Sequence, residues 1–214
     1  MSDKTQIQIS KPFGPTIAKV KMPQELIDTL NNYVDKIITD EKKANELDWG
    51  SSLAGNVKQE FQIEQAFLES SGFLKFLGLS VANWIKFSGK PEIKKFNVKS
   101  SWIVRQFKDE YNPIHWHSGH VSGVGYLKVP ENLGSPRQEI KRKNNNGKLE
   151  LIHGSKMFLS NSTLMITPKV GDFYFFPNYL MHTVYPFANS DDERRSVSFN
   201  ANIDDNIYNA YLDE

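Results

Sequence analysis

Apolar residues in the first ninety positions recur every three or four residues, the spacing of a helix with one buried face. From Pro23 this spacing predicts an amphipathic helix with the proline in its first turn. Its apolar positions are Leu26, Ile27, Leu30, Tyr33, Val34, Ile37 and Ile38. A second helical region includes Phe67 and Leu68, breaks at residues 70–72 and resumes over residues 73–85. We therefore expect a helical support over residues of about 20–90.

The hydrophobic period then changes to that of strands. In FNVKSSWIVRQF, residues 96–107, apolar positions alternate with other positions, so that alternate residues share one face. Short apolar runs separated by turn residues follow: VSGVGYLKV, KLELI, LMITP, DFYFFP, HTVYPF and RSVSFNANI. Helices followed by many short strands predict an α+β fold whose β core, residues of about 94–203, is a sandwich or barrel. No linker divides the chain, so we expect residues 1–214 to form a single domain.

Composition narrows the classes of partner and site. The 214 residues carry a net charge of +1, which favours neither nucleic acid nor an anionic membrane as a partner. The absence of cysteine excludes disulfides, zinc–thiolate sites and iron–sulfur clusters, and predicts a cytoplasmic protein whose metal ligands are nitrogen and oxygen. No apolar run reaches membrane-spanning length, and the start, MSDKTQIQIS, is too polar for a signal peptide. The basic stretch RQEIKRKNNNGK, residues 137–148, is expected to be an exposed loop.

Three of the five histidines lie in NPIHWHSGH, residues 112–120. On an extended strand, His115 and His117 project from one face and Trp116 from the other, which directs two imidazoles at one ion. A third ligand must come from elsewhere, and His182, among aromatic residues in FPNYLMHTVYPF, is the candidate. The alternative is a polar loop that happens to contain several histidines.

Twelve positions after His182 comes the strand RRSVSFN, in which Arg194, Ser196 and Ser198 share one face. The Arg194 guanidinium and the Ser196 hydroxyl can together bind a carboxylate. The alternative is a surface arginine on an edge strand. What is uncommon is the order of these features along the chain: paired ligands come first, then a distant histidine, and then R-x-S.

These stretches resemble the iron(II)- and 2-oxoglutarate-dependent oxygenases, which are built on a double-stranded β-helix, a jelly-roll or cupin-like core. More narrowly, they resemble a group of such oxygenases from marine bacteria and their phages. The matching stretches are NPIHWHSGHVSGVGYLKVP, PKVGDFYFFPNYLMHTVYPF and RRSVSFN, within residues of about 100–200. The resemblance implies that His115 is the first iron ligand and His182 the distal ligand. It also implies that Arg194, with Ser196, binds the far carboxylate of 2-oxoglutarate.

One position departs from the superfamily pattern: His117 stands where an acidic ligand is usual. Either His117 is itself a ligand, or a carboxylate from the preceding loop, Asp109 or Glu110, completes the site, or the site has lost its chemistry. The narrower group resembles an H-x-H arrangement here, so we favour His117. His120 is a spare candidate that we interpret as a polar loop residue or a residue behind the ligands.

The resemblance implies a dioxygenase that uses iron(II), 2-oxoglutarate and dioxygen to hydroxylate an unidentified substrate, with release of succinate and carbon dioxide. Two alternatives stay open: a non-catalytic jelly-roll binding module, and a three-histidine cupin-type enzyme that needs no 2-oxoglutarate.

Because metal binding requires neutral imidazole, activity should fall below a pH of roughly 6. The substrate can be a small molecule or a peptidyl residue, and an exposed edge strand can pair two copies into a homodimer. Trp102 and Tyr126 can line the pocket, but we interpret them as core.

Overall fold

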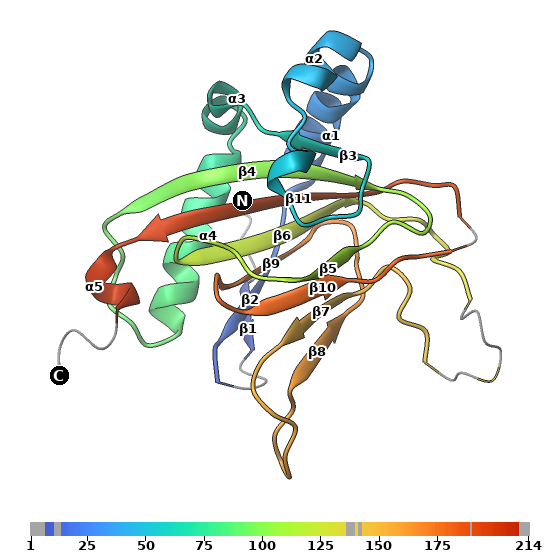
Figure 1. The fold of residues 1–214 in the computed structure, drawn as a ribbon. Helices are drawn as coiled ribbons and strands as arrows, with labels where there is room; N and C mark the ends of the chain where they lie inside the picture. The colour runs from blue at the N-terminus through green and yellow to red at the C-terminus, as the bar shows by residue number, and fades with distance from the viewer. Residues whose placement is uncertain (1–6, 11–13, 136–139, 141–142, 189, 210–214) are drawn as a thin grey trace.

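Two antiparallel sheets form the centre of the computed structural model, which describes residues 7–10, 14–135, 140, 143–188 and 190–209 (Figure 1). Within these residues the larger sheet has, in spatial order, β1 (Ile7–Ser10), β2 (Ile17–Lys21), β9 (Asp172–Pro177), β6 (Val121–Lys128), β11 (Arg194–Ile203), β4 (Phe96–Gln106) and β3 (Gln59–Gln62). The smaller sheet has, in order, β5 (Asn112–His115), β10 (Met181–Val184), β7 (Leu149–Ile152) and β8 (Thr163–Ile166). Every strand pair in both sheets is antiparallel, which confirms the expected α+β jelly-roll class.

The two sheets pack against each other through a small apolar cluster. Ile17 and Phe176 come from the larger sheet, and Leu149, Leu151 and Ile166 come from the smaller sheet. All five side chains are at most 5% exposed. This cluster fills one part of the space between the sheets, and the cavity that holds the histidines occupies another part.

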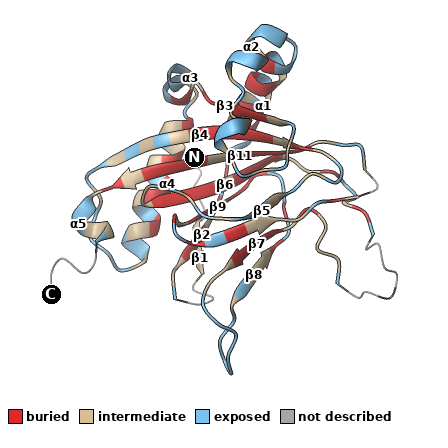
Figure 2. Cartoon of the chain, in the orientation of Figure 1, coloured by how far each residue is buried: buried red, intermediate tan, exposed pale blue. Residues whose placement is uncertain are grey.

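Helices cover the opposite face of the larger sheet. The long helices α1 (Gln24–Ile38) and α4 (Phe73–Phe87) place their buried side chains in one large cluster with residues of β2, β6, β9 and β11. Figure 2 shows the buried residues on the sides of these helices that face the sheet. The short helices are α2 (Glu41–Glu46), α3 (Gln65–Ser70), α5 (Asp205–Tyr208) and a 3-10 turn at Gly50–Ser52. The two predicted helical regions are therefore confirmed, including the break before residue 73.

The N-terminal ninety residues also contribute strands that the hydrophobic pattern did not predict. Strands β1, β2 and β3 belong to the larger sheet, and β3 forms one of its edges beside β4. Each has only four or five residues, too few for a two-residue period to stand out. The expected division into a helical support over 20–90 and a β core over 94–203 is therefore incomplete.

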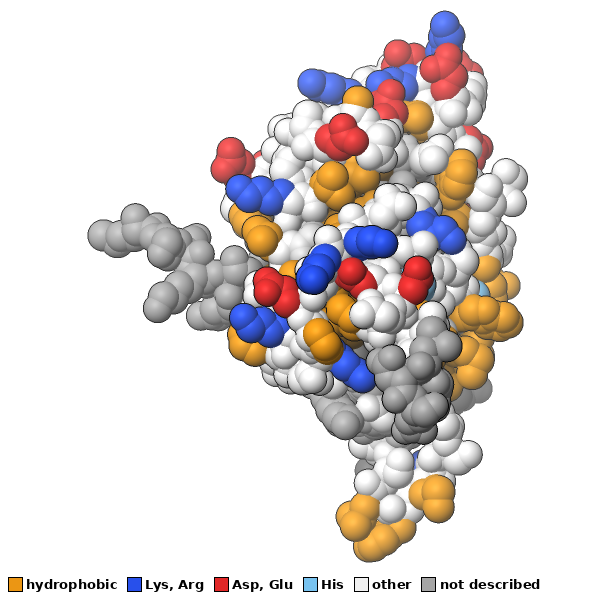
Figure 3. Space-filling view, turned by 90° about the vertical axis from the view of Figure 1, so that its left-hand side faces the viewer, with side chains coloured by type: hydrophobic (Ala, Val, Ile, Leu, Met, Phe, Trp, Pro, Cys, Tyr) orange, Lys and Arg blue, Asp and Glu red, His pale blue; other side chains and the backbone are white. Residues whose placement is uncertain are grey.

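Several other expectations concern the surface. Residues 136–139 and 141–142, in and beside the basic stretch 137–148, lie outside the described residues. No helix in the described part of the chain is long and apolar enough to cross a membrane. Figure 3 shows basic and acidic side chains interspersed over one face of the molecule, in keeping with the net charge of +1.

Candidate metal and cosubstrate centre

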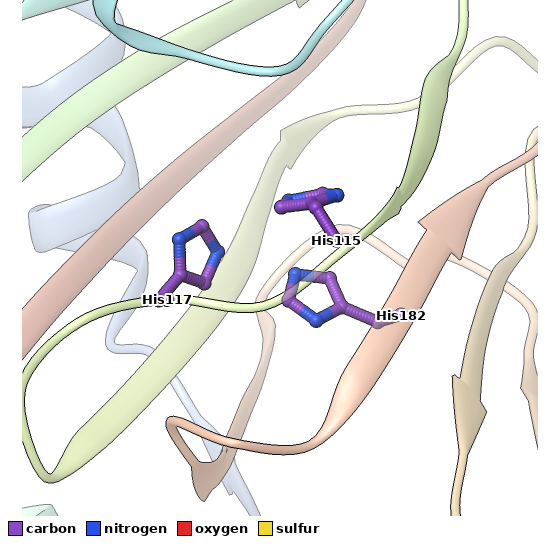
Figure 4. A group of neighbouring side chains, drawn as sticks. All are labelled: His115, His117 and His182. Carbon is purple, nitrogen blue, oxygen red and sulfur yellow. The ribbon is translucent and has the colours of Figure 1, made fainter.

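The three predicted histidine ligands meet in one cluster between the sheets. One ligand atom from each of His115, His117 and His182 lies within 4.8 Å of the others (Figure 4). The ring centroids are 4.3 Å apart for His115 and His182, and 4.9 Å apart for the two pairs that include His117. Imidazoles at these separations can bind a single transition-metal ion.

Strand register brings two of the three histidines together. His115 ends β5, and it lies directly opposite His182 in the antiparallel pairing with β10. Directly opposed residues on neighbouring strands have side chains on the same face, a few ångströms apart. The cluster therefore depends on a pairing between segments that are far apart in the sequence.

Local hydrogen bonds fix the orientation of these two rings. Nδ1 of His115 lies 2.7 Å from the carbonyl oxygen of Pro113, and Nδ1 of His182 lies 2.9 Å from that of Leu180. A carbonyl can only accept, so Nδ1 is the protonated nitrogen in each ring and donates the bond. This tautomer leaves the lone pair of Nε2 free to bind a metal ion.

His117 reaches the cluster from just beyond the end of β5 rather than from the strand itself. Its backbone N–H donates to the carbonyl of Asn178, and the Asn178 side-chain amide donates to the carbonyl of His117. Its ring lies 5.5 Å from that of Trp102. The strand expected to continue through both histidines therefore ends earlier, but the two rings still lie close together, nearly perpendicular to each other.

Burial keeps these imidazoles neutral. Burial, with the neighbouring His182 and His115, lowers the pKa of His117 to about 3. Burial and the neighbouring His115 lower the pKa of His182 to about 4, and burial also lowers the pKa of His115. Neutral imidazole is the form that binds metal, so His117 and His182 stay in the metal-binding form below pH 6. The expected loss of activity below a pH of roughly 6 stays a prediction.

Arg194 lies on the wall of the same cavity and is only 2% exposed. Its Nη1 donates to Oε1 of Gln106 over 2.9 Å, but Nε and Nη2 have no hydrogen-bond partner among the described residues. Burial lowers the pKa of the guanidinium. A buried cation with two unused donors beside a cavity is complementary to an anion, most directly a carboxylate that binds to both.

Two further side chains flank this arginine because of strand register. Gln106 of β4 lies opposite Arg194 of β11, and Tyr126 of β6 lies opposite Ser196 of β11. The Tyr126 hydroxyl lies beside the guanidinium but lacks hydrogen-bond geometry, and burial raises its pKa to about 12. Trp102 and Tyr126, interpreted from sequence as core, are buried and also line the cavity. Sequence reasoning missed Gln106.

The other sequence candidates lie elsewhere. Asp109 and Glu110 are outside the histidine cluster and line a separate surface depression, and Glu110 accepts hydrogen bonds from the backbone of Lys58 and Phe107. His120 stacks on Tyr208 at 4.0 Å and is also outside the cluster. Of the proposed third ligands, only His117 comes close to the other two histidines.

The residues of the cavity fit iron(II) and 2-oxoglutarate. Three neutral nitrogen donors suit a first-row metal ion, and a facial set of three protein ligands leaves positions for other molecules. The unused donors of Arg194 suit a carboxylate in the same cavity. Fold and site together define a jelly-roll protein with a candidate non-haem metal centre.

Comparison with known families agrees with this class. Residues 100–200 match the family described as "Putative 2OG-Fe(II) oxygenase". This stretch of the chain is therefore similar to the 2-oxoglutarate- and iron(II)-dependent oxygenases. No protein in a search of curated proteins matched the chain.

Solved structures share the fold at low sequence identity. A viral collagen prolyl hydroxylase from Paramecium bursaria Chlorella virus-1, solved with 2OG, has a TM-score of 0.56 at 16% identity, covering 90% of this chain and 98% of its own. A prolyl-4-hydroxylase from Pseudomonas putida has a TM-score of 0.52 at 15% identity, covering 92% and 93%. The epimerase SnoN of nogalamycin biosynthesis has a TM-score of 0.55 at 15% identity, covering 86% and 76%. These similarities show the fold.

Proposed function

We propose that the chain is an iron(II)- and 2-oxoglutarate-dependent dioxygenase that hydroxylates a substrate still to be identified. His115, His117 and His182 hold the iron, and Arg194 with Ser196 binds the far carboxylate of 2-oxoglutarate. The observation that carries the proposal is the convergence of three neutral imidazoles and a buried arginine with two unused donors on one cavity.

When bound, iron(II) and 2-oxoglutarate would supply the oxidation that places one oxygen atom of dioxygen in a substrate C–H bond and the other in succinate, with release of carbon dioxide. The chain orients these components. The carbonyls of Pro113 and Leu180 hold the Nδ1 protons of His115 and His182, so the Nε2 lone pair of each ring would be free to bind iron(II). The buried wall formed by Trp102 and Tyr126 excludes water.

One observation supports a second candidate, a three-histidine metal enzyme without 2-oxoglutarate. His117 stands where the superfamily usually has a carboxylate, so the metal would be held by neutral ligands alone. Arg194 favours the first candidate, because an enzyme without an anionic cosubstrate has no use for a buried cation with unused donors. A non-catalytic binding module is a third candidate, which an experiment must distinguish from the two enzymes.

An anaerobic titration tests the proposal directly. Metal-free protein receives iron(II) and then 2-oxoglutarate, and the visible charge-transfer band of the chelated cosubstrate is followed. We expect a band in the wild type, no band in His182→Ala, and a band that requires far more 2-oxoglutarate in Arg194→Met. The matched control is His153→Ala, because His153 is outside the histidine cluster and does not line the cavity.

The outcomes separate the candidates. Iron bound by the wild type without any 2-oxoglutarate band favours the three-histidine enzyme. No iron binding to a folded wild type contradicts both enzyme proposals and leaves the binding module. A band equally strong in Arg194→Met contradicts the role of Arg194 alone.

A further inference from the structure

Glu60 is a buried carboxyl group without a partner. It lies on β3, is 1% exposed, and neither Oε1 nor Oε2 has a hydrogen-bond partner among the described residues. Burial, together with the nearby carboxylates of Asp48 and Glu110, raises its pKa to about 7. A buried charge with neither a counter-charge nor a donor is costly, so its presence calls for an explanation.

Strand pairing places this carboxyl group beside the metal cavity. Glu60 lies opposite Val104 of β4, so the two side chains share a face of the larger sheet, and Val104 lines the cavity. A side-chain carbon added at Gly55 would lie 2.8 Å from both Oε1 of Glu60 and Oδ1 of Asn112. Asn112 also lines the cavity. Glu60 is therefore adjacent, through Asn112, to the space where a substrate would bind.

The chemistry around Glu60 is that of an acceptor site. Gly50 and Gly55, in the segment that precedes β3, face the carboxyl group, so no side chain of theirs fills the space around it. Oxygens of Asn112 and Asp48 also lie beside these two glycines, and no basic side chain is among the causes of the Glu60 pKa shift. Acceptor oxygens grouped without a basic side chain are complementary to a ligand with several N–H groups and a positive charge.

We propose that Glu60, with the amide oxygen of Asn112, binds a positively charged alkylammonium or guanidinium group of the substrate. This inference rests on the proposed function, because it concerns the substrate of the same cavity. Asn112 begins β5 and His115 ends it, which separates the charged group from the metal cluster by roughly 10 Å of strand. The substrate class is therefore a basic molecule or side chain whose reacting carbon lies several bonds from its charge.

A binding experiment tests this inference without requiring turnover. Metal-free protein is titrated at pH 8 with n-hexylammonium, n-hexylguanidinium and the neutral n-hexanol, and the backbone amide signals of Gly55 and Asn112 are followed by NMR. We expect the wild type to bind at least one of the two cations at least tenfold more tightly than the alcohol. Glu60→Gln should lose this preference, whereas Glu131→Gln, which removes an exposed carboxylate, should keep it.

A second variant covers the case in which Glu60→Gln fails to fold. Gly55→Ala keeps the carboxylate but places a carbon 2.8 Å from both acceptor oxygens, so it should also reduce the preference for cations. Equal binding of cation and alcohol by the wild type, or an unchanged preference in Glu60→Gln, overturns the inference. In that case Glu60 is a buried carboxyl group that takes no part in substrate binding.

The iron–2-oxoglutarate band separates this inference from the proposed function. Glu60→Gln should retain the band of the wild type, because Glu60 does not belong to the histidine cluster. A wild type with the band but without cation preference contradicts the substrate class alone. A wild type with cation preference but without the band contradicts the oxygenase and leaves a cation-binding cavity.

Discussion

Arg194 and Arg195 are neighbours on β11, both almost completely buried, yet their surroundings are opposite. Arg195 faces α1, where its Nε and Nη2 donate to the carboxylate of Glu193, its Nη2 to Asp35, and its Nη1 to the backbone and side-chain oxygens of Asn31. All three of its nitrogens are therefore bonded within the fold.

Arg194 faces the cavity, and within the described residues only its Nη1 is bonded, to the neutral Gln106. Burial by itself lowers the pKa of an arginine, and the pKa of Arg194 is lowered. Burial also acts on Arg195, but its bonds to Glu193 and Asp35 hold its pKa above the usual value. The difference teaches that burial alone does not identify a binding residue. The unused donors of Arg194 are the reason for proposing it as a binding residue, because the described residues give it no carboxylate partner.

The largest effect on the fold should come from Arg195→Met. The variant leaves the largely buried carboxylate of Glu193 without one of its two arginine partners, and breaking such a buried pair costs on the order of 3 kcal/mol of unfolding free energy. Denaturant unfolding measures this change. Molecules that remain folded should bind 2-oxoglutarate as the wild type does, since Arg195 faces away from the cavity. A wild-type unfolding free energy would contradict the structural role of Arg195.

Arg194→Met should give the reverse pattern. The variant removes a buried cation that lacks a counter-charge, so the unfolding free energy should stay equal or rise. The affinity for 2-oxoglutarate should fall on the order of 100-fold, because truncating one partner of a buried charge pair costs about 2–5 kcal/mol. The anaerobic titration measures the affinity, and Arg195→Met is the control. A loss of stability without loss of affinity would mean that Arg194 stabilises the fold and does not bind 2-oxoglutarate.

The contrast between the two arginines was partly predictable from sequence. The two-residue period of a strand assigns Arg194 and Arg195 to opposite faces, and the same reasoning placed His115 and His117 together. The resemblance to the oxygenases suggested which arginine faces the site. The two longest helices, with apolar stripes of several turns, were equally readable.

The partners of Arg194 were not predictable, because they depend on register between distant strands. Gln106 and Tyr126 lie 88 and 68 positions away along the chain and become neighbours of Arg194 and Ser196 only through the pairing of β11 with β4 and β6. A hydrophobic period shows which residues share a face but not which strand lies alongside. Glu60 escaped notice for the same reason, since β3 is too short to be recognised from its pattern.

Giving Arg194 the kind of partner that Arg195 has should weaken cosubstrate binding. In Gln106→Glu, a carboxylate would replace the amide oxygen that now accepts from Nη1 of Arg194. The cosubstrate must then compete with an internal counter-charge, so we expect about a tenfold lower affinity for 2-oxoglutarate, or about 1.4 kcal/mol. Gln106→Met, which removes the hydrogen bond without adding charge, should cost less. An equal or larger loss in Gln106→Met would mean that hydrogen bonding, rather than charge competition, sets the affinity.

The smallest effect should appear in the dependence of stability on acid. Burial raises the pKa values of Glu193 and Asp35, but Arg195, with Arg105 beside Glu193 and Lys128 beside Asp35, outweighs burial and lowers both. A carboxyl group whose pKa is lowered in the folded protein stabilises the fold at pH values above its pKa in the unfolded chain, which is 4.5 for Glu193 and 3.8 for Asp35. This stabilisation is lost as the pH falls through the lower pKa of the folded state. Below pH 4.5 the unfolding free energy of Arg195→Met should therefore fall less steeply than that of the wild type. We expect the total acid-induced loss to be smaller by only about 1 kcal/mol, because solvent screens the half-exposed Asp35. Arg194→Met should parallel the wild type, because Arg194 has no carboxylate partner among the described residues. Parallel curves for all three proteins would mean that the ion pairs of Arg195 are no stronger in the folded chain than in the unfolded one.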